Sequence, residues 1–211
     1  MKTIGIFGTS GFAREVNDIA NELGFQTIYI ARDQEELDSW NFPGEAVLEG
    51  AISNYRDMVF AIGIGENIVR QKIAQRYGAQ LPFVNLIHPS ASFGKGQLEI
   101  VNASKGVIVC AGVRFTNNIQ VGSFSIFNLN TTIGHDVIVE DFANVSPGAN
   151  ISGNVHIGSR CWVGTGAVIN QGKGTAKLRI GEDTMIGSGA VVIKDCEPNA
   201  VYVGAPAKRI K

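Results

Sequence analysis

The sequence lacks a surplus of charge of either sign. Its 211 residues include 18 Lys and Arg against 19 Asp and Glu, for a formal net charge of −1. Binding nucleic-acid phosphates requires a basic surface, so we expect no nucleic-acid partner. Gly5 and Gly8 come too early for the apolar stretch of a signal peptide, and no segment approaches the roughly 20 apolar residues of a membrane span. We therefore expect a cytoplasmic protein without membrane insertion.

Cysteine and histidine are also scarce. The only cysteines, with no CxxC pair among them, are Cys110, Cys161 and Cys196. This odd number without zinc-site spacing argues against a disulfide framework and against a zinc site. We expect these cysteines to be small core or surface residues, and we expect no bound metal. The only histidines are His88, His135 and His156.

Glycine, in contrast, is abundant, at 26 residues, and much of it follows a repeat. An aliphatic residue or Phe stands at every sixth position, with one break: Val109, Phe115, Val121, Phe127, Ile133, Val139, Val145, Ile151, Ile157, Val163 and Ile169, then Ile180, Ile186 and Val192. Four positions after most of them stands a small or β-branched residue, as at Val113, Ile119, Thr131, Val137, Ala143, Ala149, Val155, Cys161, Ala167, Thr184 and Ala190. Gly often follows the sixth position directly, at 122, 134, 158, 164, 181 and 187.

A step of six matches neither the 3.6-residue period of a helix nor the two-residue alternation of a strand. It is the signature of hexapeptide repeats, in which three hexads form one coil of about 18 residues. We therefore predict a left-handed parallel β-helix over residues 89–211, in preference to a right-handed or other all-β solenoid. The repeated apolar residue should point into a triangular prism, and the glycines should serve at turns that are difficult for other residues.

Two stretches depart from the repeat. Residues 90–108 keep its phase poorly, which predicts a degenerate first coil that caps the stack. Between Ile169 and Ile180 the step is 11 residues rather than six, because of a polar, Gly-rich, basic insert at residues 170–179, NQGKGTAKLR. Such a segment must leave the prism as a loop. It either covers a substrate or is a plain surface loop.

Residues 1–88 show a different pattern, in which apolar strands alternate with helices. We predict strands at 2–8, 26–30, 58–64 and 81–87. The first helix should bury Val16, Ile19, Ala20 and Leu23, and a second, over 66–77, should bury Ile68, Val69, Ile73 and Ala74. Three or four parallel strands with helices on both faces make a Rossmann-like α/β domain, with its boundary near residue 88.

The start of this domain has the order of a nucleotide-binding βαβ unit. A strand, a turn from Gly8 to Gly11, a helix, a second strand and Asp33 follow one another. In such units the turn amides and the helix N-terminus hold phosphate, and the acid binds a ribose hydroxyl. The full GxGxxG motif is absent, which disfavours a dinucleotide enzyme. The alternative is a scaffold that merely caps the prism.

Several segments together resemble one family: GTSGFAREV at 8–16, AIGIGENIVRQKI at 61–73, LIHPSA at 86–91, IGHDVIVEDFANVSPGANISGNVHIG at 133–158 and VGAPAKRI at 203–210. They resemble the bacterial sugar O- and N-acyltransferases related to sialic acid O-acetyltransferase and to the UDP-4-amino-sugar N-acetyltransferases of bacillosamine synthesis. The resemblance spans nearly the whole chain. It implies a homotrimer, with acetyl-CoA between adjacent prisms and a nucleotide sugar held by the α/β domain.

The resemblance also implies roles for individual residues. His135 matches the catalytic base, Asp136 its acidic neighbour, and Gly153 the glycine whose N–H faces the thioester oxygen. Nucleotide-sugar contacts fall on Ser10, Gly11, Phe12, Arg32, Asp33 and Gly63. Coenzyme contacts fall on Asn144, Gly153, Thr165 and Ser188. Some members carry His at the positions of Phe12 and Asn144, so this chain departs from them there.

The chemistry of acyl transfer from a thioester agrees with these roles. A proton must leave the attacking amine or hydroxyl, and a neutral imidazole with an ordinary pKa near about 6.5 suits that task. A backbone N–H suits the oxyanion that develops on the carbonyl. We expect direct transfer without an acyl-enzyme. Of the other histidines, His156 should be solvated outside the prism and His88 should pack at the domain junction.

The predicted function is transfer of acetyl from acetyl-CoA to the amine of a UDP-linked amino sugar, UDP-4-amino-4,6-dideoxy-N-acetyl-hexose, in bacterial glycan biosynthesis. One alternative is O-acetylation of sialic acid or another sugar hydroxyl. Another, of a different class, is a non-catalytic scaffold that binds sugar nucleotides. A γ-type carbonic anhydrase requires three His ligands on zinc, and only His135 and His156 lie inside the regular repeat, so we exclude it.

Overall fold

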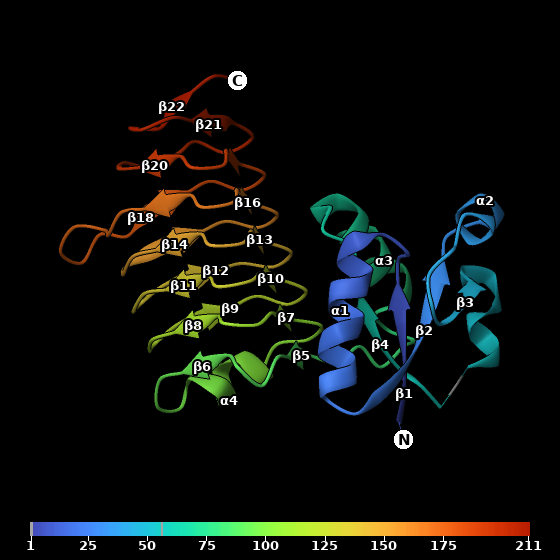
Figure 1. Cartoon of the computed structure of the whole chain (residues 1–211). Helices are drawn as coiled ribbons and strands as arrows, with labels where there is room; N and C mark the ends of the chain where they lie inside the picture. The colour runs from blue at the N-terminus through green and yellow to red at the C-terminus, as the bar shows by residue number, and fades with distance from the viewer. Residues whose placement is uncertain (1, 56) are drawn as a thin grey trace.

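The structure is a computed structural model that describes residues 2–55 and 57–211. It consists of an α/β domain that packs beside the lower coils of a tall prism (Figure 1). The elements of the α/β domain are β1 (Lys2–Phe7), α1 (Gly11–Glu22), β2 (Phe25–Ala31), α2 (Gln34–Asp38), β3 (Glu45–Leu48), the 3₁₀ helix η1 (Glu49–Asn54), β4 (Val59–Ile62) and α3 (Asn67–Tyr77). Among the described residues, none of the helices has the length and apolar character that crossing a membrane requires.

The α/β sheet is parallel, in the order β3-β2-β1-β4. One face packs on α1, and the other packs on α3 and η1. This confirms the predicted Rossmann-like layering, but the predicted strand at 81–87 is wrong. Phe83 makes only an isolated bridge to Phe60, whereas Leu86 and Ile87 already pair with the prism. The fourth strand is β3, which is only four residues long and contains no fully buried residue.

The predicted buried faces of the helices need correction. In α1, Val16, Ile19 and Ala20 are buried as predicted, whereas Leu23 lies past the helix end and is 41% exposed. In α3, the buried residues are Asn67, Arg70 and Ala74, and Ile68 and Val69 are exposed. The prediction that the apolar residues of α3 are the buried ones is wrong. This helix directs polar side chains toward the prism, where backbone carbonyls accept their hydrogen bonds.

The prism has three faces of parallel strands. Face 1 holds β5 (Leu86–Ile87), β7 (Ile108–Val109), β10 (Ile126–Phe127), β13 (Asn144–Val145), β16 (Trp162–Val163), β19 (Met185–Ile186) and β21 (Val201–Val203), with β22 (Lys208–Arg209) antiparallel at its end. Face 2 holds β6 (Ser92–Phe93), β8 (Arg114–Phe115), β11 (Thr132–Ile133), β14 (Asn150–Ile151), β17 (Val168–Ile169) and β20 (Val191–Val192). Face 3 holds β9 (Gln120–Val121), β12 (Ile138–Val139), β15 (Val155–Ile157) and β18 (Leu178–Ile180). The expected domain boundary at residue 88 falls directly after β5.

The six-residue repeat fills the prism as predicted. Every repeated apolar position from Val109 to Val192 is buried, and Val121, the most exposed of them, is only 7% exposed. The small residues four positions later are buried as well. The three cysteines lie in the core, where burial raises the pKa of the Cys161 thiol to about 12. A thiol of this kind is not a nucleophile at neutral pH.

The reason for the repeated glycines differs from the predicted one. The position with left-handed backbone lies three residues after the apolar one, and it is occupied by Asn118, Asp136 and Asn154 as well as by glycines. The glycine directly after the apolar residue is required by close stacking: a Cβ on Gly134 would lie 2.5 Å from the Gly153 nitrogen of the next coil. Contact between coils, not turn conformation, therefore selects these glycines.

The first coil is irregular and caps the prism, as predicted. After β5 and β6 the chain forms α4 (Gln97–Asn102), which packs below β9 at the base of face 3. The buried Gln97 side chain donates to the Ile119 carbonyl at 2.7 Å and accepts from the Ile119 N–H at 2.9 Å. One side chain thus supplies the hydrogen bonds that a further strand would otherwise make.

Arg70 of α3 joins the two domains. Its guanidinium is 1% exposed and donates to the carbonyls of Phe124, Phe142, Ala143, Ile64 and Gly65 and to the Asn67 side chain. Burial lowers the pKa of Arg70 to about 9, so the group is still charged at neutral pH. Because donors and acceptors are matched, a buried cation can hold the α/β domain on the prism.

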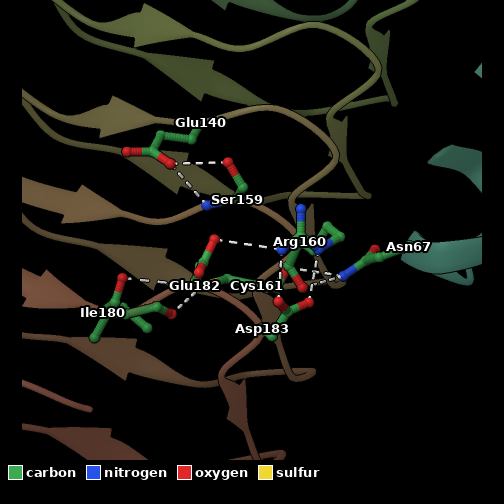
Figure 2. Close-up of polar contacts among 9 residues, drawn as sticks. Asn67, Glu140, Ser159, Arg160, Cys161, Ile180, Glu182 and Asp183 are labelled. Carbon is green, nitrogen blue, oxygen red and sulfur yellow. Dashed lines mark hydrogen bonds and ion pairs between the residues drawn. The ribbon is translucent and has the colours of Figure 1, made fainter. Parts of the chain in front are cut away.

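Asn67 makes a second connection, which Figure 2 shows beside an ion pair of the prism. Its side chain donates to the carbonyls of Arg160 at 2.7 Å and Cys161 at 3.1 Å. Arg160 in turn forms a two-pronged ion pair with Asp183 of the next coil, at 2.8 and 2.6 Å. The corner between faces 3 and 1 is thereby tied both to the α/β domain and to the coil above.

Candidate active site

His135 and Asp136 lie together at the corner between faces 2 and 3, directly after β11. We call this the catalytic corner, residues 134–137 with 152–155 of the next coil. The His135 Nδ1 lies 2.6 Å from Asp136 Oδ2, and the two side chains are 49% and 44% exposed. A neutral imidazole that donates from Nδ1 to the carboxylate keeps a lone pair on Nε2. The pair therefore has the geometry of an oriented general base.

Gly153 lies one coil further on, against the imidazole. A Cβ on residue 153 would lie 2.8 Å from His135 Cδ2 and still closer to Nε2, so only glycine leaves room for the ring. Among the described residues, none accepts a hydrogen bond from the Gly153 N–H. A base and a free backbone donor are thus side by side, which is what attack on a thioester requires.

Neighbouring coils support Asp136. Its backbone is left-handed, with a φ of 61°, and Asn118 of the coil below donates to its Oδ1 at 2.5 Å. Hydrogen bonds from His135 and then from Asn118 are the main causes that hold the pKa of Asp136 below its ordinary value, and the Lys177 charge acts in the same direction. The carboxylate is therefore ionised at neutral pH.

The other histidines have partners of their own. His156 Nε2 lies 2.7 Å from Glu140, and Arg179 Nη1 lies 2.9 Å from His156 Nδ1. The side chain points away from the prism core but is only 22% exposed, so the prediction of a solvated residue is wrong. His88 accepts from the Ser90 N–H at 3.0 Å near the domain junction. Neither lies at the catalytic corner.

The α/β domain has a cavity at the carboxyl ends of its strands. We call it the nucleotide pocket. It measures about 420 Å³ and is lined by Phe7, Gly8, Thr9, Ser10, Ile30, Arg32, Glu36, Glu49, Ile64, Val69, Lys72, Ile73 and Arg76. α1 begins at Gly11, and its N-cap residue Ser10 makes no side-chain capping bond. The first amides of this helix are therefore open to an anion.

Of the acidic residues that follow β2, Glu36 rather than Asp33 lines this pocket. Asp33 caps α2 by accepting from the Glu36 N–H at 2.9 Å, and it pairs with Arg32 at 2.7 Å. Glu36 accepts from the Thr9 hydroxyl and, at 2.8 Å, from the Arg32 N–H. The sequence pattern correctly predicted an acidic residue after β2 for this site. It could not show which of several carboxylates there faces into the pocket.

The predicted nucleotide-sugar residues therefore divide into two groups. Ser10 and Arg32 line the pocket, whereas Gly11, Phe12, Asp33 and Gly63 are not among its lining residues. Phe12 packs on the core beneath α1. Gly63 is buried, its N–H donates to the Phe7 carbonyl at 2.9 Å, and a Cβ on it would lie 2.7 Å from Ala13 Cα. Close helix-to-strand packing accounts for Gly63.

The predicted coenzyme residues lie on different sides of the prism. Asn144 is 4% exposed on face 1, where its Nδ2 donates to the Gly65 carbonyl at 3.0 Å, and no described residue pairs with its Oδ1. Thr165 and Ser188 are exposed at successive turns of the corner between faces 1 and 2. Gly153 alone lies at the catalytic corner.

One chain thus does not bring all the predicted site residues together. The α/β domain packs on face 1 and on the corner between faces 3 and 1, whereas His135 is at the corner between faces 2 and 3. Sequence reasoning also missed Glu36 and Lys72 in the pocket, and Asn118, Asn154 and Lys177 at the catalytic corner. Asn118 and Asn154 stand 18 residues on either side of Asp136, and the coil length could have identified them.

Known proteins resemble both parts of the chain. Residues 3–77 match the family model described as PglD N-terminal domain. The GDP-perosamine N-acetyltransferase of Escherichia coli O157:H7 is 28% identical over 222 residues, covering 100% of this chain and 97% of that protein. Among solved structures, WeeI from Acinetobacter baumannii AYE is 26% identical, with a TM-score of 0.82 and full coverage of both chains. PerB from Caulobacter crescentus, solved with CoA and GDP-perosamine, has a TM-score of 0.84 at 24% identity, covering 100% of this chain and 98% of that one.

The α/β domain followed by a parallel β-helix is thus a fold that this chain shares with PerB and WeeI. Over its whole length the chain is similar to a sugar N-acetyltransferase, and its first domain is similar to the PglD N-terminal domain.

Proposed function

We propose that this protein transfers the acetyl group of acetyl-CoA to the amine of a nucleotide-linked amino sugar. The observation that carries the proposal is the arrangement of His135, Asp136 and Gly153, in which a base with a free Nε2 lies against an unpaired N–H. The relatives support the acceptor class, since one is named a GDP-perosamine N-acetyltransferase and another was solved with CoA and GDP-perosamine.

The corner residues divide the chemistry between them. The His135 Nε2 accepts a proton from the sugar amine as its nitrogen attacks the thioester carbonyl, and Asp136 holds the imidazole through Nδ1. The Gly153 N–H donates to the oxyanion, and collapse of the tetrahedral intermediate releases CoA thiolate, which takes up the proton. A positioned base contributes about 10²–10⁴-fold to such a step, and an oxyanion donor about 3 kcal/mol.

The nucleotide pocket binds the other end of the acceptor. The diphosphate would face the amides at the start of α1 and the positive charge of Lys72 and Arg32, and Glu36 would accept from a ribose hydroxyl. The sequence favoured a UDP-linked 4-amino-4,6-dideoxy sugar, whereas GDP-perosamine stands in the name of one relative and in the solved complex of another. Both nucleotides therefore belong in the test.

We further propose that the enzyme works as a homotrimer in the cytoplasm, where acetyl-CoA is made and consumed. The support is the separation of the catalytic corner from the nucleotide pocket and from Thr165 and Ser188 within one chain. Adjacent prisms would close a thioester site between their corners. Light scattering should give three times the chain mass, and a monomeric active enzyme would contradict this assembly.

The deciding experiment offers the purified protein acetyl-CoA with UDP- and GDP-linked 4-amino sugars, their 4-hydroxy counterparts and free sialic acid. CoA release is followed with a thiol reagent, and the product by mass spectrometry. We expect acetylation of a nucleotide-linked amine, and a loss of about 10²–10⁴-fold in kcat for His135→Ala. The matched control is His156→Ala, which should retain activity. Preferred acetylation of a hydroxyl would make the enzyme an O-acetyltransferase, and no turnover of any acceptor would favour a scaffold.

A further inference from the structure

The insert at residues 170–179 docks on the catalytic corner instead of leaving the prism freely. Figure 1 shows it as an orange loop before β18, on the side of the prism away from the α/β domain. The Gly172 N–H donates to the Gly153 carbonyl at 3.2 Å, and the Leu178 N–H donates to the Asn154 carbonyl at 3.1 Å. The Asn154 Nδ2 donates back to Gly174 and Ala176, at 3.1 and 3.0 Å.

Lys177 connects the insert to the coil that holds the catalytic base. Its ammonium donates to the Asp136 carbonyl and, at 3.2 Å, to Asn154 Oδ1. The Asp136 backbone is left-handed, a conformation that is unfavourable for a residue other than glycine. A donor on its carbonyl fixes the orientation of this peptide, and the Asp136 carboxylate then fixes the imidazole of His135.

The same loop holds the peptide that follows the proposed oxyanion donor, between Gly153 and Asn154. The Gly153 carbonyl accepts from Gly172, and Asn154, the next residue, is bonded through both its backbone and its side chain. The insert thus contacts both Asp136, which orients the base, and Gly153, whose N–H is the proposed oxyanion donor.

We propose that the insert is a clamp in which Lys177 is a positioning residue, holding Asp136, and through it His135, in line with Gly153. The inference rests on the proposed function for its kinetic consequences. Misplacement of a reacting group by about 1 Å can cost about 10²-fold in rate. The clamp therefore predicts a defect in kcat with little change in KM for either substrate.

The test compares Lys177→Met with Lys173→Met, which removes the same charge from an exposed residue of the same loop. We expect kcat to fall about tenfold to 10²-fold for Lys177→Met and to stay within about twofold for Lys173→Met. Lys177→Arg, which still carries donors for a carbonyl, should recover most of the rate. Deleting residues 173–177 restores the six-residue step of the prism and should lower kcat as Lys177→Met does.

A second readout does not depend on turnover. In the wild type, ¹⁵N NMR should show His135 as the tautomer protonated at Nδ1, and the Gly153 amide should give a single sharp signal. Lys177→Met should shift or broaden both signals, whereas Lys173→Met should leave them unchanged. If the wild type acetylates nothing, the proposed function fails, and the NMR comparison still tests the clamp.

Two results would overturn the clamp. One is equal kcat and equal NMR spectra for Lys177→Met and Lys173→Met. The other is a change confined to the KM for acetyl-CoA, which would make Lys177 a coenzyme-binding residue instead of a positioning one.

Discussion

The nucleotide pocket and the catalytic corner are built in different ways. The pocket is formed within one domain by the ends of β1 and β2, by the turns after β1 and β4, and by residues of α2, η1 and α3. Some of its charges are paired inside it, as Arg76 is with Glu49 at 2.7 Å. The corner is a turn repeated in successive coils, and its imidazole is about half exposed. We therefore expect nucleotide recognition to be complete in one chain, and we expect the corner to provide one wall of a reaction site. Variants that affect one region and not the other test this contrast.

The largest expected effect comes from breaking the junction between the two regions. Arg70→Leu would leave several buried carbonyls without donors, at about 1–3 kcal/mol each before the structure relaxes. We expect the free energy of unfolding to fall by about 3–5 kcal/mol, measured by urea denaturation at fixed protein concentration. Arg209→Leu, which removes an exposed ion pair with Glu197, is the control and should cost less than about 1 kcal/mol. Similar losses for both would show that Arg70 does not join the domains.

Gly153→Ala should damage only the catalytic corner. The added methyl overlaps the His135 ring, so the ring must move or the coils must separate. We expect kcat to fall by about 10²-fold, while calorimetry shows unchanged affinity for the nucleotide. Gly50→Ala is the control, because a Cβ there meets no atom within 4 Å. Unchanged kcat in Gly153→Ala would remove residue 153 from the site.

Glu36→Gln should damage only the nucleotide pocket. It weakens the acceptor that holds Thr9 and the Arg32 N–H and that we propose for the ribose. We expect about tenfold weaker nucleotide binding, since a hydrogen bond to a charged group contributes about 1.5–3 kcal/mol, with kcat at saturation preserved. Glu35→Gln, on the exposed side of α2, is the control. A fall in kcat without a change in affinity would contradict the division between the regions.

The smallest effect concerns protonation at the corner. Asn118→Ala removes the second of the donors that lower the pKa of Asp136, so this pKa should rise toward its ordinary value of 3.8 without reaching it, because His135 remains. A lowered pKa means that the carboxylate stabilises the folded protein above the ordinary carboxyl range, and that this contribution is lost as the pH falls through the folded pKa. Carboxyl ¹³C NMR between pH 2 and 6 measures the shift. An unchanged titration curve would mean that Asn118 does not support Asp136.

The prism could be predicted from the sequence far better than the α/β domain that precedes it in the chain. The stacked coils repeat one environment, so the inward positions from Val109 to Val192 carry the same signal many times over. The α/β domain repeats nothing, and β3 and the polar face of α3 depend on contacts between distant segments. Arg70 illustrates this limit, because its burial is possible only where prism carbonyls meet it.

The site shows the same division. His135, Asp136 and Gly153 were predicted from the resemblance to known acyltransferases, and the structure places them in contact, with one coil length between His135 and Gly153. Their chemical roles stay predictions until they are tested. Glu36 and Lys177 were not predicted. Their positions depend on how the short helix α2 and the insert at residues 170–179 fold back on the rest of the chain.

Strand pairing continues undisturbed past the insert. Val155, His156 and Ile157 pair with Leu178, Arg179 and Ile180 in the parallel register of the neighbouring rungs, although the connecting loop is longer. The length of a corner loop is therefore independent of the ladder that it interrupts. Each corner of the prism is accordingly a place where residues can be inserted without altering the strand ladder. Proteins of this architecture can therefore acquire new specificity by local insertion alone.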